Sequence, residues 1–204
     1  EELIEMHPFS EGSRPPLVAE EPANDKLEQQ LLAESLAELV SEAWKQGDAT
    51  NGAKLFYREK TACANCHDAR TDFQLGPKLT VPRKPATEEF LVASILNPSK
   101  VILKGFQSVT VITDQGSVLS GYLVERSDDK LTLSIAAQKG KLVDVAVADI
   151  DEIVESKQST MPAGLVKSFK DRAEFLDLAR FVLEINRGGA AKLRQLKKKA
   201  NVGG

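Results

Sequence analysis

Both cysteines of this 204-residue chain lie within the five positions Cys63-Ala64-Asn65-Cys66-His67, and one of its two histidines completes them. In a chain of this length, chance places two cysteines three positions apart about 1% of the time. Requiring a histidine directly after them makes the coincidence about a hundredfold rarer. We therefore interpret the five residues as one chemical site. The rest of the chain has to fold around it.

Three chemistries use a cysteine pair at this spacing. A thiol–disulfide couple lies where a strand runs into a helix of a βαβ unit, and no buried parallel-strand pattern precedes Thr61. A structural zinc ion needs four ligands, and only His7 adds another of the usual kind. Covalent haem attachment uses all three residues, because one helical turn presents Cys63 and Cys66 to the two haem vinyl groups and sets His67 beneath the iron. We therefore expect one covalently bound haem c.

The residues around the motif resemble the opening of a class I cytochrome c. The segment "GDATNGAKLFYREKTACANCHDARTDFQLGPKLT" has a helix with a glycine and an aromatic residue, the haem motif, and a Gly-Pro-x-Leu turn. The resemblance implies that Gly52 and Phe56 lie where the N-terminal helix crosses the C-terminal helix. It also implies that Pro77 accepts a hydrogen bond from His67, and that Leu79 packs on the porphyrin. The alternative for Gly52 is a simple Asn-Gly turn before the helix.

The same resemblance implies a methionine as the second axial ligand of the iron. The two methionines are Met6, in an acidic leader rich in proline, and Met161, in the turn "QSTMPAGLV". An isolated methionine usually fills a gap in a core. With a haem in place, we expect Met161 to be the distal ligand, and His7 is its rival.

The 93 residues between His67 and Met161 exceed what a small cytochrome c needs. The first part, "PATEEFLVASILNPSK", predicts a helix with Thr87 as its N-cap and a stop at Asn97-Pro98. Polar and apolar residues then alternate in five segments separated by turns: "FQSVTVIT", "SVLSGYLVER", "KLTLSIAA", "KLVDVA" and "IDEIVES". These segments predict a five-stranded antiparallel meander, the size of a small SH3-like or Sm-like barrel. We expect its ends, near Lys100 and Ser156, to lie close together, and the module to be separable from the haem domain.

A cytochrome c split in this way resembles the planctomycete-type bacterial haem-binding domain family. The matching features, in order, are "NPSK" at 97–100, Gly105-Phe106, "DQGSVLSGYLVERSDDKLTL" and Met161-Pro162, within the range 50–187. The resemblance implies an exported, periplasmic protein whose signal peptide is absent from this chain. Members of that family are often fused to a larger sugar-dehydrogenase-like protein, so a fused dehydrogenase domain remains open.

The expected fold class is α+β, a mostly helical cytochrome c haem domain with an inserted β domain. The haem domain covers 25–100 and 157–187 with an extra N-terminal helix over 26–46, and the insert covers 101–156. Asp25 is expected to cap the first helix and Ser168 the last, whose inward residues are Phe175, Leu178, Phe181 and Val182. Residues 1–24 are expected to form an extended arm. Residues 188–204 are expected to form a basic tail, either a solvated helix extension or a docking patch for an acidic redox partner.

Composition excludes several functions. The net charge is −3, with an acidic first quarter and six basic residues but no acidic one after position 186, which does not indicate a nucleic-acid partner. No apolar run approaches the roughly 20 residues of a membrane span. We expect a non-enzymatic protein that carries single electrons between a donor and an acceptor protein. Three alternatives stay open: a haem enzyme or gas or redox sensor from which Met161 is displaced, a module whose β insert binds a protein, and an electron relay within a larger dehydrogenase.

Overall fold

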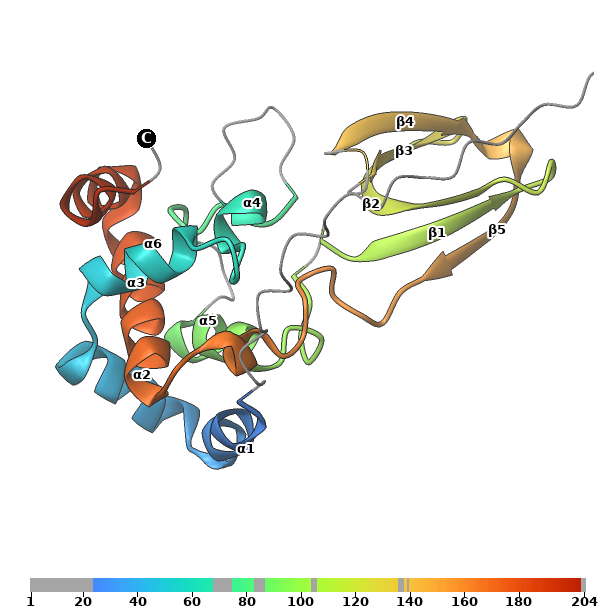
Figure 1. The fold of residues 1–204 in the computed structure, drawn as a ribbon. Coiled ribbons are helices and arrows are strands. Elements are labelled where there is room, and N and C mark those ends of the chain that lie inside the picture. The colour runs from blue at the N-terminus through green and yellow to red at the C-terminus, as the bar shows by residue number, and fades with distance from the viewer. Residues whose placement is uncertain are drawn as a thin grey trace, which may run out of the picture.

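The computed structural model describes residues 24–67, 75–82, 87–103, 106–135, 138 and 140–202. Within these ranges the chain forms six α-helices and one five-stranded antiparallel sheet, which confirms the expected α+β class. Figure 1 shows the helices gathered on one side of the molecule and the strands on the other. The expected arm lies outside the described residues except for Asn24, and so do Met6 and His7.

The helices begin and end at local signals. They are α1 (Asp25–Ala33), α2 (Leu36–Gln46), α3 (Ala49–Tyr57), α4 (Cys63–His67), α5 (Glu88–Leu96) and α6 (Arg172–Ala200), with 3-10 turns η2 (Val147–Asp149) and η3 (Leu165–Ser168). Thr87 caps α5 as predicted, since its Oγ1 accepts a hydrogen bond from the Phe90 amide at 3.1 Å. The predicted cap of α1 is wrong by one residue, because Asn24 Oδ1, not Asp25, accepts from the Leu27 amide at 3.2 Å.

The single helix expected over 26–46 is two helices in the structure. Ser35 has an extended backbone (φ −69°, ψ 132°) and separates α1 from α2. The break lets Glu34 at the end of α1 and Glu42 on α2 both form ion pairs with Arg172 at the start of α6. The ion pairs with the distant Arg172 thus accompany the division of this helical sequence into α1 and α2.

The last helix starts later than expected and continues into the basic tail. Ser168 ends η3, and Asp171 is the N-cap of α6, because its Oδ1 accepts from the Glu174 amide at 3.1 Å. The tail was expected as a helix extension or a docking patch, and residues 188–200 continue α6 through a kink at Gly189 (φ 63°). Leu196 and Ala200 are buried, so this extension packs on the helical core.

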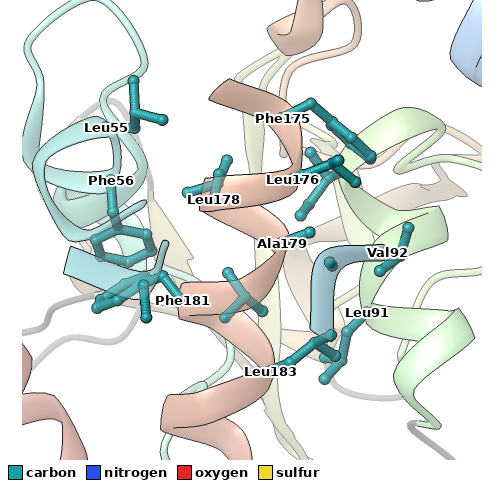
Figure 2. Close-up of a cluster of buried hydrophobic side chains, with 14 of the residues drawn as sticks. Leu55, Phe56, Leu91, Val92, Phe175, Leu176, Leu178, Ala179, Phe181 and Leu183 are labelled. Carbon is teal, nitrogen blue, oxygen red and sulfur yellow. The ribbon is translucent and has the colours of Figure 1, made fainter. Parts of the chain in front are cut away.

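Helix α6 forms the centre of the helical part, and its inward residues were predicted from the apolar pattern. Phe175, Leu178, Phe181 and Val182 are all buried and share one hydrophobic cluster with residues of α1, α2, α3 and α5. Figure 2 shows the part of this cluster where α6 meets α3 and α5. Helix α3 crosses α6 at Gly52, where a Cβ atom would meet the carbonyl oxygen of Asp177. Glycine therefore allows the two backbones to approach closely, and the Phe56 and Phe181 rings pack beside the crossing with centroids 5.1 Å apart.

The strands lie within the five predicted segments, but their order corrects the predicted meander. They are β1 (Ser108–Thr113), β2 (Val118–Arg126), β3 (Lys130–Ile135), β4 (Lys141–Ala146) and β5 (Ile150–Glu155), arranged β4-β3-β2-β1-β5. Only β1 to β4 form a meander, and β5 pairs with β1. The turn η2 carries the chain across the sheet: the Val147 amide donates to Asp129 O at 2.8 Å, and the Asp114 amide donates to Asp149 O at 3.0 Å.

The sheet encloses a hydrophobic cluster of its own, formed by Val109, Val111, Leu131, Leu133, Ile135 and Val145. The two segments that join it to the helices run side by side. The Ser159 amide donates to Ser99 Oγ at 3.1 Å, and the Ser156 amide donates to Ser108 O at 2.8 Å. The entry and exit of the β domain are therefore adjacent, as expected.

Candidate functional site

The motif Cys63–His67 forms the short helix α4 directly after a turn, in which the Thr61 and Ala62 amides both donate to the Arg58 carbonyl oxygen. The hydroxyl of Thr61 is buried and lies 3.0 Å from the Arg58 carbonyl oxygen, with the Leu55 carbonyl oxygen also in contact. The next residue, Ala62, has a left-handed backbone (φ 52°), which is uncommon for a residue with a Cβ atom. These two residues end the approach from α3 and start α4 in a new direction.

Both thiols of the motif line a cavity of about 300 Å³, within the roughly 300–1,000 Å³ range typical of small-molecule and cofactor sites. The wall is mostly apolar and comes from segments far apart in the sequence: α4, the turn at 75–81, α5, the loop after it, β2, the loop at 159–162, η3 and α6. His67 and Met161 both belong to this wall. The fold therefore brings together the four residues expected to hold haem.

His67 is oriented by the Gly-Pro turn. Its Nδ1 lies 3.0 Å from the Pro77 carbonyl oxygen, which can only accept, so Nδ1 carries the proton and Nε2 keeps its lone pair. A Cβ atom on Gly76 would lie 2.9 Å from His67 Cε1, so glycine lets the turn approach the ring this closely. Burial lowers the pKa of His67, partly opposed by the bond to Pro77. A neutral imidazole with one nitrogen fixed and the other free is the form that binds a metal.

The rest of this turn is held by α6, a contact without any local sequence signal. Asn186 Nδ2 donates to the Leu79 carbonyl oxygen at 3.0 Å, and both residues line the cavity. Leu79 packs against the helical core. The Phe56 ring lies near the His67 ring, and the centroids of these two rings are 6.5 Å apart. Asn186 therefore ties the Gly-Pro turn to α6.

The state of the two thiols bears on the thiol–disulfide alternative. Cys63 and Cys66 are free thiols, and burial raises the pKa of each. A redox-active CxxC pair needs a thiol pKa that is lowered, because the thiolate is the nucleophile. Within the described ranges, no group of three His, Cys, Asp or Glu side chains is arranged to hold a metal ion. His7, the further ligand of the zinc alternative, lies outside these ranges.

Met161 is presented by a short loop stabilised by hydroxyl groups. Its amide donates to Ser159 Oγ at 3.1 Å, and the Ser159 amide donates to Ser99 Oγ just after α5. Met161 is half-buried and followed by Pro162, which is exposed but also lines the cavity. The thioether side chain and His67 thus belong to the same cavity, although no local pattern connects them.

The β domain also contributes to the cavity wall, and the expectation that it is separable from the haem domain stays a prediction. Tyr122 on β2 and Phe106 before β1 line the cavity, with ring centroids 6.2 Å apart. The Tyr122 hydroxyl forms a hydrogen bond with Thr160 Oγ1. Burial, with the nearby Cys66 thiol, raises the pKa of Tyr122 to about 12, so it is a neutral phenol at ordinary pH. Sequence alone does not reveal this contact, because it joins positions 38 residues apart.

No family model matches this sequence, and no curated protein matches it significantly. The resemblance to cytochromes c therefore rests on the residues of the motif, the two turns and the inserted sheet. Across the part of the chain that the structure describes, none of the helices is long and apolar enough to cross a membrane.

Proposed function

We propose that this protein is a monohaem c-type cytochrome that carries single electrons between redox partners. In this proposal Cys63 and Cys66 would hold the haem through two thioether bonds, and His67 and Met161 would bind its iron. One observation carries the proposal: a single apolar cavity is lined by both thiols, by an imidazole whose Nε2 is free, and by a thioether sulfur residue.

The side chains present suit this group. A haem bound in the cavity supplies a one-electron ferrous/ferric couple. Pro77 fixes the His67 ring and increases the electron density of its free nitrogen. A methionine ligand favours the ferrous state, so Met161 is expected to give a positive reduction potential. The apolar wall, including Leu79, limits the access of water and the reorganisation on electron transfer.

The partners and the compartment follow from this chemistry. Haem is attached to a CxxCH pair outside the cytoplasm, so we expect the protein to act in the periplasm. Its partners are then a donor and an acceptor redox protein, or a dehydrogenase domain fused to this chain. The extension of α6 beyond Gly189 carries a cluster of lysines, Lys197, Lys198 and Lys199, which suits an acidic partner.

The test is whether haem remains on the polypeptide under denaturing conditions. Acid-acetone extraction of the purified protein should leave one haem per chain, with a pyridine haemochrome spectrum typical of two thioethers. Replacing both Cys63 and Cys66 by alanine should make the haem extractable. Asn65→Ala, an exposed change inside the same motif, is the matched control and should leave haem attached. Free extraction of haem from the unaltered protein would refute the c-type assignment.

A further inference from the structure

The loop that presents Met161 is held from two other segments of the chain. Among the described residues, the hydrogen bonds that reach positions 159–161 from elsewhere come from Ser99, after α5, and from Tyr122, on β2. Ser99 binds the loop at Ser159, and Tyr122 binds it at Thr160. The β domain therefore contacts the residue that immediately precedes the expected distal ligand.

The surroundings of Tyr122 hold its side chain in one position. The residue is 6% exposed, and its ring lies at 76° to the Phe106 ring in an edge arrangement. A buried tyrosine hydroxyl requires a hydrogen-bond partner, and Thr160 Oγ1 is that partner. Strand pairing fixes the backbone on both sides, since Tyr122 lies opposite Ser108 on β1 and Ser134 on β3.

Met161 needs such support more than most side chains would. Methionine is unbranched and has three rotatable side-chain bonds, so its sulfur position is poorly determined by its own conformational preferences. Met161 is half-buried in a loop, and Pro162 after it is exposed. Fixing the Thr160 side chain limits the positions open to the adjacent Met161 backbone and hence to the sulfur.

We propose that Tyr122 is a positioning residue that keeps Met161 in place as distal ligand, so that the β domain controls access to the sixth coordination position of the iron. This inference rests on the proposed function. It gives the inserted sheet a specific role: displacement of β2 releases Thr160, and the released loop allows Met161 to yield to a small external ligand. The β domain then acts on the haem site through one hydrogen bond.

The experiment uses the full haem-loaded ferric protein and imidazole as a competitor of Met161. Tyr122→Phe removes the hydroxyl and keeps the ring. Loss of one hydrogen bond of ordinary net strength should raise the apparent imidazole affinity about 2- to 10-fold. The weak ferric charge-transfer band of iron–thioether bonding should disappear at lower imidazole concentrations. Covalent haem content should not change.

Matched variants separate positioning from general loosening of the sheet. Ser120→Ala, on the same strand, removes a hydroxyl that bonds Thr110 Oγ1 at 2.8 Å outside the cavity, and it should leave imidazole affinity unaltered. Thr160→Val should reproduce the effect of Tyr122→Phe, and the double variant should add nothing further, because both changes remove the same bond. Thr160→Ser keeps a hydroxyl and should retain the affinity of the unaltered protein.

The outcomes are distinct. Unaltered imidazole affinity in both Tyr122→Phe and Thr160→Val, with haem still attached, overturns the positioning role alone. An equal rise in Ser120→Ala overturns it too, since the effect would then come from the sheet as a whole. If Tyr122→Phe fails to fold, Thr160→Val decides by itself. Haem that extracts freely from the unaltered protein refutes the proposed function and the positioning role with it.

Discussion

Gly52→Ala tests the crossing on which the helical part depends. A Cβ atom there would meet the Asp177 carbonyl oxygen, and would lie 2.6 Å from the Asp177 carbonyl carbon and 2.7 Å from Phe181 Cβ. Two of these atoms belong to the backbone of α6, which cannot rotate away as a side chain can. Helix α3 would therefore have to move from α6 by about 1 Å, because close-packed interiors leave no free space.

Two opposing effects determine the free energy of unfolding. Alanine is better than glycine inside a helix by about 1 kcal/mol. Overpacking usually costs about 1–3 kcal/mol, and a gap of about 1 Å forfeits up to half of the dispersion attraction across the contact. Since the Phe56–Phe181 pair and the rest of the crossing would all be affected, we expect a net loss of about 2 kcal/mol. In a chain of this size that corresponds to a fall in Tm of about 4–8 °C.

The assay is thermal unfolding of the haem-loaded protein, followed by far-ultraviolet circular dichroism. Lys54 lies exposed on the same helix, so Lys54→Ala and Lys54→Gly measure the intrinsic difference between alanine and glycine in α3 without any clash. We expect the glycine variant to be less stable by about 1 kcal/mol. A Gly52→Ala protein that is as stable as the unaltered one, or more stable, would show that the two backbones do not approach as closely as described.

Three further predictions concern the cavity. Met161→Ala should keep the haem attached, lower the reduction potential and remove the ferric iron–thioether band; an unaltered spectrum would assign the distal role to another group. Asn186→Ala leaves the Leu79 carbonyl oxygen without its partner and should lower the free energy of unfolding, measured in urea, by about 1–3 kcal/mol. An unchanged free energy of unfolding would show that this hydrogen bond does not stabilise the fold. Burial lowers the pKa of His67 from its ordinary 6.5. Below pH 6.5 the unfolded haem-free chain therefore binds more protons than the folded haem-free chain. The free energy of unfolding should fall as the pH is lowered from there. The fall should be smaller in His67→Gln, and equal pH profiles would contradict the shift.

Several features could be predicted from local sequence because they depend on local chemistry. The motif Cys63–His67, the cap at Thr87 and the five alternating segments specify geometry within one turn or one strand. The apolar spacing of Phe175, Leu178 and Phe181 likewise specifies which face of α6 is buried. In each case the interacting groups are only a few residues apart, so spacing is sufficient.

Other features were decided only when distant segments met. The pairing of β5 with β1 involves strands far apart in the sequence. The same holds for the ion pairs of Arg172 across the break between α1 and α2, and for the bond from Asn186 to the Leu79 carbonyl oxygen. The contribution of Tyr122 to the cavity is of the same kind. Its alternation in β2 predicts a strand but does not say what covers that face of the sheet. What covers this face depends on how the inserted sheet packs against the Met161 loop, and that follows from the packing of the whole chain. The hydrophobic effect is non-directional, so any apolar surface could cover Tyr122.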